Sequence, residues 1–359
     1  MRRFIALPLL LAAGTLPAQS LWNNSSVRSG PQYYSFNVHG TEKVSELAIP
    51  VYFVVPVSQR FTMDIGTAYA SVDLDRTNAD QTHTKSSISG ITDTQLRGNY
   101  ALGGDRFVLT AGINLPTGSS TITPDEIDAA TRMGSDFLSL PVSGFGTGTS
   151  MTAGAAVAQP IGSWNFGLGG SVREGTQYTP FRDASDSAVK YTPGPEYRVR
   201  VGFDRPNGSG RFALGFMYSK FGDDKANAAT YNTGDRYIGQ LSMSNSIFTG
   251  VDYSFVAWDL YRSAGTLIDG SISPSSNMTN ALIGLGIGSG GFNVQPNVEV
   301  RSVVSDQLVK TNAMVTAGAR IVISRGLWTI VPGGGYTVGH MDQGSLSGLR
   351  ATLAIRFGG

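Results

Sequence analysis

The sequence predicts an all-β protein, a closed antiparallel transmembrane β-barrel of about sixteen strands, with about fourteen strands as the alternative. Three observations predict this fold. Apolar and polar residues alternate strictly over stretches long enough to cross a bilayer, the connections are alternately short and long, and charged residues are scarce. Charged residues make up 15% of the chain, against roughly 25% in an average soluble protein, so the surface offers little charge to water.

The hairpin at 94–115 shows the alternation on both of its strands. Apolar or small residues occupy every second position from Leu96 to Leu102 and again from Phe107 to Leu115, and a glycine turn joins the two runs. At about 3.3 Å per residue, about nine or ten tilted residues cross the hydrocarbon layer. A short turn, two strands of this length and one long loop form the repeating unit of an outer-membrane barrel.

The same alternation recurs along the rest of the chain. We expect further strands at 34–38, 47–55, 63–69, 151–157, 164–172, 197–203, 212–218, 237–243, 251–255, 281–287, 292–300, 315–323, 328–336 and 349–357. Pro50 and Pro56 argue against regular pairing where they stand, and 73–87 is interpreted as a polar connection. Asp259 falls on the apolar side, which indicates a bulge or an early exit from the bilayer. A soluble β-sandwich or β-helix is the alternative, but its strands average only about 5 to 6 residues.

The N-terminus has the features of an export signal. A basic start at Arg2 and Arg3, an apolar core and a small-residue site predict a signal peptide at 1–18, with a short anchor helix as the alternative. A short periplasmic segment at 19–30 and the barrel at 31–359 then follow. We expect the short turns and both chain ends in the periplasm and the long loops outside. This arrangement predicts the outer membrane of a Gram-negative bacterium, with membrane lipid as a partner and a homo-oligomer as a possible assembly.

Strand parity predicts which charged side chains face the barrel interior. A charge on the lipid face costs about 2 to 4 kcal/mol at the bilayer midplane, so charged residues between apolar positions should face the lumen. The predicted pore-lining residues are Arg97, Arg106, Arg198, Arg200, Arg236, Glu299, Arg301, Arg320, Arg350 and Arg356. They form either a basic wall that tunes permeation or a set of salt bridges that ties the interior together.

The segment at 116–148 is the longest connection and the third on the external side. Thr123 and Pro124 are typical of the N-cap and first turn of a helix, which we expect to continue to Ala130 or beyond. Its acids are Asp125, Glu126, Asp128 and Asp136. Because their charge is opposite to that of the arginines, we hypothesise that the loop folds into the lumen as a constriction. A helix lying over the mouth of the barrel is the alternative.

Three motifs carry a resemblance to a known family. They are Gly90-Ile91-Thr92-Asp93-Thr94-Gln95-Leu96-Arg97, Ala111-Gly112-Ile113-Asn114-Leu115-Pro116-Thr117-Gly118 and Gly144-Phe145-Gly146-Thr147. The chain here resembles the outer-membrane channel family associated with the meta-pathway of phenol degradation, which is similar in turn to FadL-like aromatic hydrocarbon channels. The resemblance implies passive uptake of small, often hydrophobic or aromatic molecules. Because the arginine-rich interior suits polar solutes better, the alternatives are a general pore for polar or anionic solutes and a structural barrel with a plugged lumen.

The sequence favours a channel over an enzyme. The only histidines are His39, His83 and His340, all expected in external segments, and none begins the His-x-Ser pattern of outer-membrane phospholipases. No metal or cofactor site is predicted, and the glycine-rich run at 286–291 is interpreted as a hairpin turn because no helix follows it. The formal charge of +1 excludes a strongly basic nucleic-acid binder.

Overall fold

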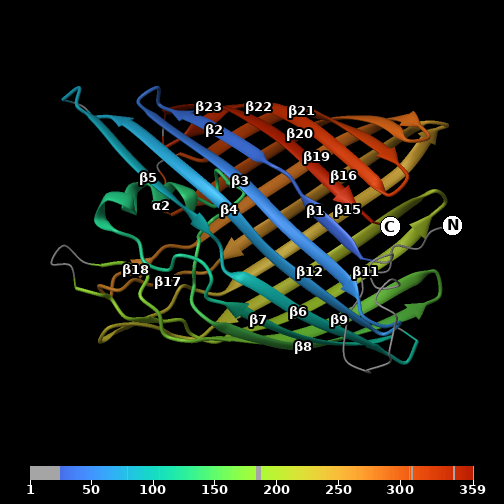
Figure 1. Ribbon diagram of the computed structural model, residues 1–359, viewed down its shortest axis with the longest axis horizontal. Coiled ribbons are helices and arrows are strands. Elements are labelled where there is room, and N and C mark those ends of the chain that lie inside the picture. The colour runs from blue at the N-terminus through green and yellow to red at the C-terminus, as the bar shows by residue number, and fades with distance from the viewer. Residues whose placement is uncertain are drawn as a thin grey trace.

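The computed structural model describes residues 25–358, apart from 79, 105, 183–186, 307, 309 and 343. The predicted signal peptide lies outside the described residues. The chain forms a closed 16-stranded antiparallel β-barrel, as the sequence predicts (Figure 1). Among the described residues, no helix is long and apolar enough to cross a bilayer.

Most strands of the barrel are continuous. These are β3 (Glu42–Pro56), β4 (Phe61–Thr77), β7 (Phe107–Leu115), β8 (Ser150–Ile161), β9 (Trp164–Gly175), β11 (Glu196–Asn207), β12 (Gly210–Phe221), β15 (Arg236–Phe248), β16 (Val251–Arg262), β19 (Ser276–Ser289), β20 (Phe292–Ser305), β21 (Asn312–Arg325), β22 (Trp328–Met341) and β23 (Gly344–Phe357). Two strands consist of two pieces each: β1 (Ser26–Ser29) with β2 (Gln32–Val38), and β5 (His83–Ile91) with β6 (Thr94–Leu102). Strand β23 pairs with β22 on one side and with β1 and β2 on the other, so the sheet has no free edge.

The connections sort by length between the two ends of the barrel. One end carries hairpin turns, together with the start of β1 and the end of β23, which pair as Val27 with Phe357. The other end carries every long loop (Figure 1). These loops contain the short helices η1 (Pro124–Glu126) and α2 (Ile127–Met133) and the small strands β10 (Tyr191–Thr192), β13 (Asp224–Ala226), β14 (Ala229–Tyr231), β17 (Gly265–Thr266) and β18 (Ile272–Ser273). The loop between β7 and β8 is the third connection at this end.

The outer wall exposes the apolar members of the alternating pattern. Leu168 is 42% exposed and Phe216 is 51% exposed, although both lie in the middle of paired strands. Near the loop end, Tyr218, Tyr237 and Tyr261 form a row across β12, β15 and β16, with ring centroids 5.0 and 6.0 Å apart. Such a row of amphipathic rings above an apolar band is typical of the interfacial girdle of a membrane barrel.

Strands β4 and β5 extend further than the sequence pattern suggested. The segment at 73–87 was expected to be a polar connection, but β4 continues to Thr77 and β5 begins at His83. Apolar and polar residues still alternate there, but the apolar residues now face inward. Val72 and Leu74 are buried, and Asp73 between them lies on the opposite face. The expectation was wrong because apolar residues on the inner face are covered by a loop rather than by lipid.

Pro50 does not disrupt β3, contrary to expectation. Strand β3 pairs with β4 along its whole length, and Pro50 stands opposite Ala68. The backbone N–H and C=O of Ala68 are directed to Thr92 on the far side of β4, so Pro50 directs its own nitrogen away from β4. That nitrogen faces the break between β1 and β2, where the regular pairing with β3 is interrupted, so no regular ladder bond is lost there.

Two other expectations change with the structure. Residues 26–29 belong to the segment that was expected to be periplasmic, but they form β1 and pair with β3 and β23 inside the barrel sheet. The bulge suggested at Asp259 is not there, since β15 and β16 pair regularly up to Arg236 and Arg262 and shift register only between Ser246 and Phe248. Asp259 instead accepts a 2.6 Å hydrogen bond from the Thr279 hydroxyl.

Candidate functional site

The loop between β7 and β8 carries the predicted helix. Element η1 begins directly after Thr123 and α2 follows it at Ile127. Glu126 accepts hydrogen bonds from the Thr123 backbone N–H at 2.8 Å and from its hydroxyl at 2.9 Å. These bonds satisfy polar groups that the start of a helix leaves free. Glu126 is therefore used within the loop and does not reach the barrel wall.

The loop contacts strands on opposite sides of the barrel. On one side, the Ser86 hydroxyl of β5 donates a 2.6 Å hydrogen bond to the carbonyl of Asp125. On the other, Arg262 of β16 pairs with Asp136 at 2.9 Å, and Arg301 of β20 donates a 2.9 Å bond to the carbonyl of Phe137. If β1 and β2 together are counted as the first strand and β5 and β6 together as one strand, β4 is the third strand around the sheet and β16 is the eleventh of 16. The loop therefore connects facing walls.

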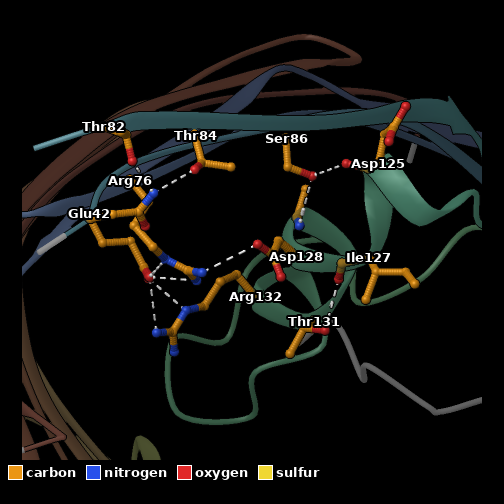
Figure 2. Close-up of polar contacts among 12 residues, drawn as sticks. Glu42, Arg76, Thr82, Thr84, Ser86, Asp125, Ile127, Asp128, Thr131 and Arg132 are labelled. Carbon is orange, nitrogen blue, oxygen red and sulfur yellow. Dashed lines mark hydrogen bonds and ion pairs between the residues drawn. The ribbon is translucent and has the colours of Figure 1, made fainter. Parts of the chain in front are cut away.

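A buried carboxylate anchors helix α2 to β3 and β4 (Figure 2). The side chain of Glu42 is 7% exposed and pairs with Arg76 at 2.9 Å and with Arg132 at 2.6 Å. Arg76 also pairs with Asp128 of α2 at 3.3 Å. Sequence reasoning missed Glu42, Arg76 and Arg132, because the first two lay outside the expected strands and Arg132 was taken as part of an acidic loop.

Apolar side chains of the loop pack against the inner wall near these ion pairs. Ala129 and Leu138 are completely buried, and so are Phe36 of β2 and Val44 of β3. The same cluster extends to Met314, Met341 and Leu346 on β21, β22 and β23. Burial of this kind contributes roughly 1.5 to 3 kcal/mol for each large side chain, so the loop is held by packing as well as by charge.

Several of the predicted arginines have a carboxylate partner. Arg97 pairs with Asp64 at 2.8 Å, and Arg198 pairs with Glu196 on its own strand. Glu299 pairs with both Arg301 and Arg350, at 2.7 and 2.8 Å, and all three side chains are at most 14% exposed. Arg350 also lies 5.2 Å from the centre of the Tyr34 ring.

Other predicted arginines lack such a partner. Within the described ranges, no carboxylate pairs with Arg200, Arg236, Arg320 or Arg356. Arg320 donates to the side-chain oxygen of Gln295, and Arg236 lies 5.0 Å from the centre of the Phe221 ring. Arg106 lies in the turn directly before β7, at an exposed position, and its backbone carbonyl accepts a 2.8 Å hydrogen bond from the N–H of Ala158 on β8.

The four predicted acids of the loop divide between two roles. Asp128 and Asp136 pair with wall arginines, but their partners Arg76 and Arg262 were not among the predicted residues. Glu126 caps the helix, and Asp125 meets the wall through its backbone carbonyl. The charge complementarity expected between loop and wall is thus present, with different basic partners.

Two cavities line the inner wall below the loop. One has a volume of about 470 Å³ and is bordered by polar side chains that include Gln295, Asn297, Arg320 and Arg350. The other has a volume of about 530 Å³ and is bordered by the inner faces of β8 to β15, where glycine and alanine are frequent. Both cavities have two arginines in their lining, Arg320 and Arg350 in the first and Arg200 and Arg211 in the second.

Tyrosines pack between two further loops at the same end. The rings of Tyr178 and Tyr191 are 5.3 Å apart and nearly perpendicular, and Tyr231 lies 6.4 Å from Tyr191. Burial raises the pKa of Tyr178 to about 12, and burial together with the nearby Asp224 raises the pKa of Tyr191. These rings stay neutral at physiological pH and join the loops by packing and hydrogen bonds.

The histidines give no support to a catalytic centre. His39 and His340 bond through Nε2 to the carbonyl oxygens of Met341 and Thr311, at 2.7 and 2.6 Å. His83 lies 3.3 Å from the Thr77 hydroxyl at an exposed position. In the part of the chain that the structure describes, no group of three or more side chains could hold a metal ion.

Comparisons with known proteins support the fold. Neither a protein-family model nor a curated protein matches the chain. A bacterial polysaccharide outer membrane secretin is similar in structure, with a TM-score of 0.51 and 11% identity over 94% of this chain and 99% of that one. The anion-selective porin from Comamonas acidovorans gives 0.44 and 9% over 93% and 98%, and the CymD monoaromatic hydrocarbon channel gives 0.45 and 9% over 98% and 95%. At these identities the likeness shows the fold alone, which is that of outer-membrane β-barrels of Gram-negative bacteria.

Proposed function

We propose that the protein is an outer-membrane channel through which small solutes diffuse passively along the barrel lumen. The observation that carries this proposal is the cavity of about 470 Å³ on the inner wall, which is lined by Arg320, Arg350, Asp252, Glu299 and neutral polar side chains. A polar, hollow interior behind an apolar outer face is the arrangement that lets solutes cross a bilayer without entering lipid. In this proposal the short turns face the periplasm and the long loops face outward.

The loop between β7 and β8 is proposed to be the constriction of this channel. Its contacts with β4 and β5 on one side and with β16 and β20 on the other support a position across the lumen. The completely buried Leu138, which follows α2 in the same loop, supports the same position, because a loop resting on the mouth would leave this side chain in water. The ion pairs of Asp128 and Asp136 would then narrow the opening.

The preferred solutes are proposed to be small polar molecules and anions. The basic residues without carboxylate partners, such as Arg200 and Arg320, would attract anions, and they support this preference. Uptake of hydrophobic or aromatic compounds, which the family resemblance implies, finds less support because charged and amide side chains border the first cavity. A plugged structural barrel remains the competing account, and it predicts no permeation.

A comparison of wild type with Arg320→Gln tests the preference. A unit charge about 8 Å from a passing ion in water changes the ion's free energy by about 0.5 kcal/mol, or about twofold in permeability. We expect anions to permeate better than cations in wild type. The anion-to-cation ratio should fall about fourfold in the variant, because anion permeability falls about twofold and cation permeability rises about twofold. The measurement is the zero-current potential across a planar bilayer under a salt gradient. Arg325→Gln, which removes an exposed arginine at the turn end of β21, is the matched control.

Liposome swelling identifies the solute class. Proteoliposomes would be compared in isotonic sugars, organic anions and small neutral aromatics. The proposal is supported if proteoliposomes swell faster in sugars and anions than liposomes without the protein do. Swelling that responds to aromatics alone would favour the function implied by the resemblance, and no swelling in any solute would favour a plugged barrel.

A further inference from the structure

The junction of β5 and β6 is a β-bulge. Strand β4 pairs with β5 as far as Tyr69 opposite Ile91, and with β6 from Gly66 opposite Gln95. From 69 to 66 the chain takes three steps and from 91 to 95 it takes four, so the β5–β6 side contains one extra residue. An extra residue reverses the parity of the strand and re-aims the side chains beside it. The bulge consists of Thr92 and Asp93.

The bulge directs Asp93 to both ends of the loop between β7 and β8. One carboxylate oxygen accepts a 3.1 Å hydrogen bond from the backbone N–H of Gly118, where the loop leaves β7. The other accepts a 2.7 Å bond from the backbone N–H of Thr147, where the loop returns to β8, and a 2.9 Å bond from Asn114. The N–H of Asp93 itself donates a 2.8 Å bond to the carbonyl of Phe145.

The two stems of the loop touch each other at this point. A Cβ atom on Gly118 would lie 2.4 Å from the carbonyl oxygen of Phe145, and one on Gly146 would lie 2.9 Å from the backbone of Ser119. Only glycine fits at these positions. By contrast, a Cβ atom on Gly144, in the same stem, would meet nothing within 4 Å.

We propose that Asp93 is the positioning residue that fastens both stems of this loop to the barrel wall and thereby fixes the width of the channel. Asp93 is 7% exposed and no basic side chain pairs with it within the described residues, so these N–H groups are what stabilise its buried charge. If the stems moved away from the wall, the buried carboxylate of Asp93 would lose these hydrogen bonds. This inference rests on the proposed function, because the width of the lumen matters only to a channel.

The hydrogen bonds that Asp93 makes to both stems, called the clasp below, also explain why three motifs that are distant in the sequence belong together. Thr92-Asp93, Thr117-Gly118 and Gly146-Thr147 are far apart in the sequence, yet they form one hydrogen-bonded unit. The Thr117 hydroxyl adds a 3.2 Å bond to the carbonyl of Thr92 and accepts a 2.8 Å bond from the N–H of Thr94. Helix α2 is fastened separately by Glu42, so loss of the clasp should free the stems first.

Single-channel recording tests the clasp in the full chain. We expect Asp93→Ala and Gly118→Ala to give larger mean conductance and more open-channel noise than wild type, because unfastened stems fluctuate. Asp93→Asn keeps the shape but turns one amide N–H toward a stem N–H, so its effect should be intermediate. Gly144→Ala is the matched control and should conduct as wild type does. Wild-type conductance and noise in both Asp93→Ala and Gly118→Ala would overturn the proposal.

A labelling experiment separates the clasp from the channel function. The chain contains no cysteine, so Val142→Cys introduces a single thiol of similar size at a position that is 7% exposed on the returning stem. A water-soluble maleimide should label this thiol slowly in the wild-type background and about tenfold faster when Asp93→Ala is added, with a smaller increase for Asp93→Asn. Equal rates would overturn the clasp. If labelling accelerates but the wild-type protein passes no current, the clasp stands and the channel function fails.

Discussion

At the scale of single residues, the structure separates charges that hold the protein together from charges that are free to meet a solute. Glu42 and Glu299 are nearly buried, and each is paired with two arginines. Removing the carboxylate of such a group takes the shared partner from two arginines at once, which costs more than an exposed pair contributes. Parity alone could predict that Arg301 and Arg350 face inward, but it could not tell them from Arg320. Their shared partner Glu299 lies on β20, and its ion pair with Arg350 of β23 joins strands that are not neighbours in the sheet.

Glu42→Ala should loosen helix α2. The substitution leaves the half-buried Arg76 and Arg132 without their shared carboxylate, and we expect a loss of about 3 kcal/mol in the local stability of the loop. Hydrogen exchange of the α2 amides measures this loss. Lys85→Ala removes an exposed ion pair with Asp75 between β5 and β4. It should change the free energy of exchange of the α2 amides by less than about 1 kcal/mol. Equal protection of α2 in both variants would show that packing alone holds the helix.

At the scale of elements, alternation in the sequence was sufficient where a strand faces lipid along its length. The run at 107–115 was predicted with the observed bounds of β7, because water and lipid impose opposite chemistry on successive residues. The run at 349–357 was predicted with the observed end of β23, which begins five residues earlier, at Gly344. The part of β4 nearest the loop end was missed because its inner face packs against an apolar loop. The clasp was also not predictable as a site, because Asp93 is bonded by backbone N–H groups that have no residue-specific signature.

The loop element can be tested by deletion. Removing 123–132 takes away η1 and most of α2, and with them the pairs that Asp128 and Arg132 form with β3 and β4. We expect a higher single-channel conductance with the barrel still folded, because the lumen loses its filling. Heat-modified migration in detergent gels checks the fold. An unchanged conductance in a folded barrel would place the helix outside the conducting path.

At the scale of the whole molecule, the barrel divides its side chains between an apolar outer face and an inner face of glycine, polar groups and arginine. Cysteines substituted one at a time test this division. Leu214→Cys on the outer face should resist water-borne maleimide in lipid vesicles, whereas Ala213→Cys beside the inner cavity should react. Similar reactivity at the two neighbouring positions would mean that the strands do not stand between lipid and water.

The recording of current through the purified wild-type protein in a planar bilayer tests the central claim most directly. The account predicts discrete conductance steps, carried more by anions than by cations. A folded barrel that inserts into the bilayer but gives no current above that of the bare membrane would contradict it.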